Sequence, residues 1–138
     1  MEKEFEILEH TADIGIIAYG ADTREAYANA ARGMFSLITD FSDVEELESR
    51  EIEVESGDPE GLLVAWLNEL IFLFDTDNLL ITRSDITLLS NTALKATVYG
   101  EKADLSRHTV KMGIKAATYH MLEIKRNDGI RAIVLFDV

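Results

Sequence analysis

Apolar and polar residues alternate along several stretches of the chain, which is the pattern of β-strands with one buried face. In residues 51–55, three glutamates alternate with two β-branched residues, which predicts a half-exposed strand at the edge of a sheet. Residues 79–82 and 86–89 predict one strand that a bulge interrupts at residues 83–85. The other predicted strands are residues 5–9, 14–19, 94–98 and 130–138.

The stretch from Ile114 to Lys125 gives a mixed signal. Strict alternation predicts a strand that begins at Ala117 at the latest, although the first half is also compatible with a helical turn. Asn-Asp-Gly at residues 127–129 then predicts a tight turn. The resulting hairpin is expected to carry the last strand back along the sheet.

Two stretches have helical spacing and clear start signals. Asp22 followed by Glu25 forms a capping box, which predicts a helix that ends near Thr39. Asp58-Pro59 predicts the start of a second helix, which runs to Phe74 before residues 75–78 break it. Because the second helix is apolar nearly all round, it is expected to be the most buried element.

The predicted order is ββαβα followed by a run of strands. This order indicates an α+β fold with two helices packed on one predominantly antiparallel or mixed sheet. No repeat or linker divides the chain, so we expect a single domain across residues 1–138.

Composition restricts the function further. The 138-residue chain has 26 acidic and 13 basic residues, and its net charge of −13 argues against tight, direct binding to a nucleic-acid backbone. It has no cysteine, which excludes thiolate metal sites and cysteine nucleophiles. No signal peptide or membrane span is expected, so the predicted location is the cytoplasm. The sequence also lacks serine-hydrolase, P-loop and dinucleotide-binding motifs.

Carboxylates at the two ends of the chain suggest a metal site. Asp13 lies between the first two predicted strands, and Asp137 precedes the terminal carboxylate of Val138. If the last hairpin brings these ends together, the three carboxylates form an oxygen-only site that suits Ca²⁺ or Mg²⁺ better than Zn²⁺. Alternatively, Asp13 is a turn residue that caps its own backbone, and spacing alone slightly favours this interpretation.

The three histidines and one lysine are weaker candidates. His10, His108 and His120 lack the spacing of a zinc motif, and His108, next to an arginine in a predicted loop, is the best functional candidate among them. His120 lies on the alternating stretch, where a structural role is more common. Lys115 either reaches a carboxylate or is an ordinary surface lysine.

Five stretches together resemble the archease family over essentially the full chain. Each is weak alone, but all five occur in order in a chain of this size. They are EHTADIGI (residues 9–16), WLNELIF (66–72), GEKADLSRH (100–108), IKAATYH (114–120) and the terminal VLFDV.

The resemblance implies an accessory protein rather than an enzyme. Archeases act on the RtcB-type RNA ligase of tRNA splicing, which uses Mn²⁺ and GTP and forms a guanylylated histidine; they promote guanylylation and multiple turnover. The family pattern makes Asp13, Asp137 and Val138 ligands of a divalent cation, with Ca²⁺ as the first choice and Mg²⁺ or Mn²⁺ as alternatives. It also makes Lys115, with Asp13 and Asp137, necessary for activation of the ligase. Three further residues lie in matching motifs without an assigned role: His10, Glu101 and His108.

Two other functions remain open at this point. A metal-dependent phosphohydrolase would use the same carboxylate cluster, although basic residues to bind a substrate phosphate are sparse. A small chaperone or scaffold with a structural ion would have a broader range of partners.

Overall fold

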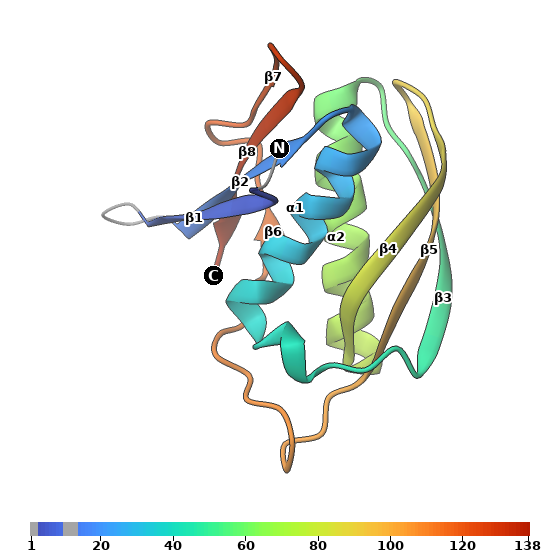
Figure 1. Cartoon of the computed structure of the whole chain (residues 1–138), viewed down its shortest axis with the longest axis vertical. Helices are drawn as coiled ribbons and strands as arrows, with labels where there is room; N and C mark the ends of the chain where they lie inside the picture. Colours follow the sequence, from blue (N-terminus) through green and yellow to red (C-terminus); the bar gives the residue numbers. More distant parts are fainter. Residues whose placement is uncertain (1–2, 10–13) are drawn as a thin grey trace.

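The structure is a computed structural model that describes residues 3–9 and 14–138. In this part of the chain, two helices lie between two antiparallel sheets (Figure 1). The α+β class and the two predicted helices are confirmed, but the strands form two sheets rather than one. The first sheet has the order β1 (Phe5–Glu9), β2 (Ile14–Gly20), β8 (Ile130–Asp137), β6 (Ala116–Ala117), with β7 (Glu123–Arg126) also paired to β8. The second has the order β3 (Glu48–Glu55), β5 (Ala93–Lys102), β4 (Leu79–Leu89).

Helix α1 (Thr23–Ile38) begins at the predicted cap. The Asp22 side chain accepts a hydrogen bond from the Glu25 N–H, and the Glu25 side chain reaches back to the N–H of Ala21. Both bonds satisfy N–H groups that a helix start leaves without partners. The helix packs on β2 of the first sheet and on β4 of the second, and a short 3₁₀ helix, η1 (Phe41–Asp43), follows it.

Helix α2 (Pro59–Asp77) is apolar nearly all round because it packs against both sheets, on β3, β4 and β5 at one side and on β6 at the other. Its Trp66 is fully buried and donates a hydrogen bond to the backbone carbonyl of Tyr27 at 2.9 Å. The helix continues through the predicted break and ends at Asn78, whose left-handed backbone (φ 55°) caps it. None of the helices in the described part of the chain is both long and apolar enough to cross a membrane.

The second sheet follows the predicted strands closely. β3 lies at an edge, as expected, and β4 is continuous, with register shifts at residues 81–83 and 86–88, the first of them next to the predicted bulge. β5 is longer than predicted and continues through Glu101, which pairs with Leu80. The strand predicted at residues 94–98 is therefore too short at its C-terminal end.

The prediction of one continuous strand from Ala117 onward is wrong. β6 covers two residues, and a turn with Met121 in the left-handed region (φ 57°) separates it from β7. β7 and β8 then form the predicted hairpin, with Asp128 and Gly129 at positive φ in its turn. His120 is exposed in the turn between β6 and β7, so it is not a buried structural histidine.

Candidate functional site

The two ends of the described chain meet in the first sheet. β2 pairs with β8, and Ile14 is opposite Phe136. Gly15 permits a close approach of these strands, because a Cβ at this position would lie 2.3 Å from the carbonyl oxygen of Val134. Asp13 and His10 lie outside the described residues. Ile14, which follows Asp13 in sequence, is nevertheless paired with Phe136, which precedes Asp137.

Lys115 and Asp137 are adjacent on this sheet. The backbone N–H of Lys115 donates a hydrogen bond to the carbonyl of Asp137 at 2.7 Å, and Ala116 is opposite Asp137 in the β6–β8 register. Both side chains are exposed, as is Val138. Among the described residues, neither the Lys115 ammonium nor the Asp137 carboxylate has a hydrogen-bond or ion-pair partner. We call Lys115, Asp137 and Val138 the terminal edge.

Helix α2 holds the terminal edge in position. The Asn68 side-chain oxygen accepts a hydrogen bond from the Ala117 N–H at 2.8 Å, and the N–H and hydroxyl of Thr118 both donate to the Leu135 carbonyl, at 3.0 and 3.1 Å. A strand of two residues has few ladder bonds of its own, so these contacts fix where Lys115 lies.

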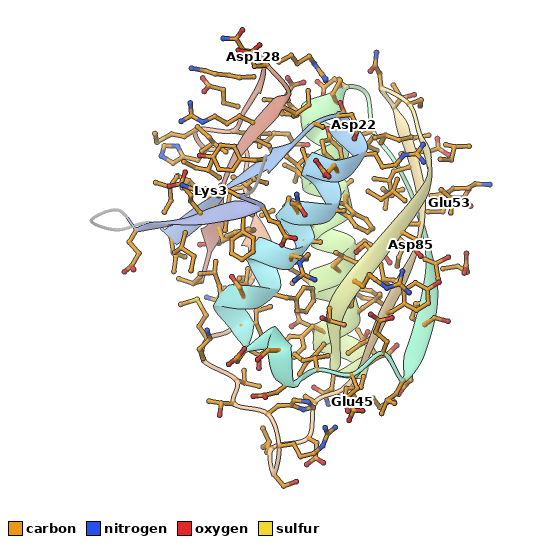
Figure 2. All side chains as sticks on the ribbon, in the orientation of Figure 1. Lys3, Asp22, Glu45, Glu53, Asp85 and Asp128 are labelled. Atoms are coloured by element: carbon orange, nitrogen blue, oxygen red, sulfur yellow. The ribbon has the colours of Figure 1, made fainter. Side chains whose placement is uncertain are left out.

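Glu101 and His108 belong to a second, buried group. Each is 3% exposed, and we call them, with Arg107 and the backbone that they bind, the Glu101 network. One Glu101 oxygen accepts from the Glu45 N–H at 2.7 Å and lies 3.4 Å from His108 Nε2, and the other accepts from the Arg107 guanidinium. His108 Nε2 also lies 3.1 Å from the carbonyl oxygen of Asp43. Glu45 marks this end of the molecule in Figure 2.

The electrostatics of the Glu101 network favour an ionised carboxylate. Burial alone would raise the pKa of the Glu101 carboxyl, but the Glu45 N–H and the Arg107 guanidinium outweigh burial and hold that pKa below its ordinary value. His108 Nδ1 accepts a hydrogen bond from the Asp104 N–H at 2.9 Å, which leaves Nε2 to carry a proton toward Glu101 and Asp43. Every polar atom of these two side chains is satisfied within the protein. The network ties the segment after β5 to the segment after α1.

Comparisons with known proteins support the resemblance that the sequence suggested. Residues 5–138 match the model of the Archease protein family (MTH1598/TM1083). The chain belongs to the archease family. It is 42% identical over 126 residues to the protein archease of Sulfolobus acidocaldarius, covering 91% of each chain.

Two solved archease-like structures have the same fold. The solution structure of Methanobacterium thermoautotrophicum protein 1598 is similar with a TM-score of 0.80 and 38% identity, covering 98% of this chain and 99% of the other. A crystal structure of an archease from Thermotoga maritima, described as a possible chaperone, has a TM-score of 0.64 and 25% identity, covering 96% of both chains.

The residues predicted for the archease site therefore separate into two places. Asp137, Val138 and Lys115 lie together at the terminal edge, whereas Glu101 and His108 lie in the Glu101 network. Among residues 3–9 and 14–138, no group of three or more acidic or histidine side chains could hold a metal ion. The exposed Asp137 side chain at the terminal edge offers oxygen ligands of the kind that hard cations prefer. The metal ligands stay a prediction.

Proposed function

We propose that this archease-family protein activates an RtcB-type tRNA-splicing ligase in the cytoplasm and is not itself an enzyme. The ligase would be guanylylated faster and would complete more turnovers in its presence. The observation that carries the proposal is the hydrogen bond between the Lys115 and Asp137 backbones, which makes two exposed charged residues neighbours on the sheet. Neither side chain has a partner among the described residues. Exposed charges that the fold itself does not use are available to a partner.

The charge of the chain fits such a partner. A ligase that binds RNA, GTP and Mn²⁺ needs basic side chains and metal ions at its active-site mouth, and a protein with a net charge of −13 would be attracted to that mouth. The same charge disfavours competition for the RNA itself. Asp137 and Lys115 would then position ligase groups on either side of the terminal edge.

We further propose that Asp13, Asp137 and the Val138 carboxylate hold a divalent cation, with Ca²⁺ as the first choice. Bound there, the ion would supply a fixed positive charge that joins the two ends of the chain or orients an acidic group of the ligase. Asp137 and Val138 would supply oxygen ligands to this ion, and Lys115 would offer a separate hydrogen-bond donor beside them.

Multiple-turnover RNA ligation tests the proposal. A small amount of ligase is assayed with GTP and Mn²⁺, with and without this protein, and with Asp13→Ala, Asp137→Ala and the control Glu55→Ala, which removes an exposed carboxylate at the end of β3. We expect the wild type and the control to raise the turnover number, and both aspartate variants to lose this effect while they remain folded. No activation by the wild type would contradict the proposal, and hydrolysis of phosphoesters by the metal-loaded protein alone would favour a hydrolase instead.

A further inference from the structure

Helix α2 has one open face, and an aromatic side chain stands on it. Phe72 is 57% exposed, although its neighbours Ile71 and Leu73 are buried. An exposed phenylalanine on a helix contributes little to folding, because its ring gains little from leaving water. Contiguous exposed apolar side chains instead mark surfaces where another molecule binds.

The position of Phe72 relative to the terminal edge follows from three contacts. Phe72 is one helical turn after Asn68, so the two residues share a face of α2. Asn68 binds the N–H of Ala117. A Cβ on Gly61 would lie 3.3 Å from the Tyr119 hydroxyl, so the end of the Tyr119 side chain lies over the first turn of the helix.

Residues 115–119 therefore run antiparallel to α2, from the level of Phe72 back toward Gly61. Lys115 is at the Phe72 end of this segment, and Tyr119, which is 65% exposed, is at the other. The two exposed aromatic side chains consequently lie near opposite ends of this segment, with Lys115 at the Phe72 end. We call Phe72, Tyr119 and the segment 115–119 that covers α2 between them the α2–β6 surface.

Acidic side chains flank the ring of Phe72. Glu69 and Asp75 lie three residues before and after it, which places all three on neighbouring positions of one helix face. Glu69 is half-buried and Asp75 is exposed, and neither has an ion pair within the described residues. A complementary surface would have an apolar socket for the ring and basic side chains around it.

We infer that the α2–β6 surface is where the partner protein of the proposed function docks, with Phe72 as the apolar anchor. This inference rests on the proposed function. The partner presents an apolar socket rimmed by lysine or arginine, and binding there places the terminal edge against its active-site mouth. Phe72 contributes affinity, whereas Asp137 and Lys115 contribute the activating contact. The two roles separate in an experiment.

The test measures both binding and activation with the full-length protein and the ligase. The variants are Phe72→Ser and Glu69→Lys/Asp75→Lys, with Leu105→Ser as the matched control, since Leu105 is 81% exposed in the loop after β5. We expect Phe72→Ser and the charge-reversed variant to weaken binding by about tenfold or more, as truncation of an interface anchor does. Their activation at saturating concentration should equal that of the wild type, because only the concentration for half-maximal activation rises. Leu105→Ser should bind like the wild type.

Four outcomes are informative. If the wild type activates the ligase but Phe72→Ser binds the ligase within twofold of the wild type, the docking surface is overturned and the proposed function stays intact. Equal weakening by Leu105→Ser also overturns it, because the effect is then not specific to this face. Self-association that Phe72→Ser abolishes would assign the surface to a second copy of the chain and overturn the proposal. A wild type that neither binds nor activates the ligase removes both the proposed function and this inference.

Discussion

The Glu101 network and the terminal edge are built from the same kinds of side chain, a carboxylate beside a cationic or imidazole group, but they differ in solvent exposure. In the network, Glu101 and His108 are almost fully buried and every polar atom is bonded. At the terminal edge, Lys115 and Asp137 are exposed, and only their backbones are bonded to each other. Buried polar groups lower the stability of a protein unless they are hydrogen-bonded, so the fully bonded Glu101 network stabilises the fold. The charges at the terminal edge stay available to a partner.

The largest effect on stability is expected in the network. Glu101→Ala would leave the Glu45 N–H without its acceptor and would remove the carboxylate that Arg107 and His108 contact, and we expect a loss of about 2 kcal/mol in the free energy of unfolding. Chemical denaturation measures this loss. Glu53→Ala, which removes an exposed carboxylate on the outer face of the second sheet (Figure 2), is the control and should change stability little. Equal losses in the two variants would remove the distinction between buried and exposed carboxylates.

The same carboxylate should make stability depend on pH. Because the pKa of Glu101 is lower in the folded protein than its ordinary value of 4.5, its contribution is fully present above about pH 4.5 and is lost as the pH falls through the folded pKa. Glu101→Gln should therefore be less stable than the wild type at pH 7, and the difference should shrink as the solution is acidified. Thermal unfolding of both proteins between pH 7 and pH 3 tests this; a difference that grows at low pH would contradict it.

An intermediate effect is expected where α2 meets β6. Asn68→Ala removes the acceptor of the Ala117 N–H, and we expect a loss of about 1 kcal/mol together with faster hydrogen exchange at the Ala117 amide. Asn91→Ala, in the exposed turn between β4 and β5, is the matched control. Unchanged exchange at Ala117 would show that β6 is held by its pairing with β8 alone.

The smallest effect on stability is expected at the terminal edge itself. Lys115→Ala and Asp137→Asn each remove an exposed charge that has no partner among the described residues, so each should change the free energy of unfolding by less than about 0.5 kcal/mol. Activation of the ligase should nevertheless fall toward its unassisted level. A stability loss as large as that of Glu101→Ala would instead give the edge a structural role.

Local signals in the sequence predicted most of the elements correctly. The Asp22–Glu25 and Asp58–Pro59 starts, the turn at Asp128–Gly129 and the edge position of β3 each depend on residues close in sequence, and the structure has all of them. The division of the strands into two sheets was not predictable in this way, because it depends on α2 packing against both. The apolar residues on all sides of α2 were the sequence signal for this arrangement.

The candidate site was only partly predictable for a related reason. The Asn-Asp-Gly turn indicated that Asp137 returns along the sheet, and the pairing of Ile14 with Phe136 agrees with that expectation. Alternation could not show that the chain turns at Met121, since a left-handed backbone at a methionine has no clear sequence signal. The motif containing Glu101 and His108 looked like a reactive loop, but distant partners such as Asp43 and Glu45 make it a buried network.

The most direct test of the account compares Asp137→Asn with Glu101→Gln in multiple-turnover RNA ligation, at a temperature where circular dichroism shows both variants folded and at saturating concentration of each. If the terminal edge activates the ligase, Asp137→Asn should leave the turnover number at its unassisted level although the protein melts like the wild type. Glu101→Gln should activate like the wild type although it melts earlier. Full activation by Asp137→Asn, with loss of activation in folded Glu101→Gln, would contradict the account and place the activating contact at the Glu101 network.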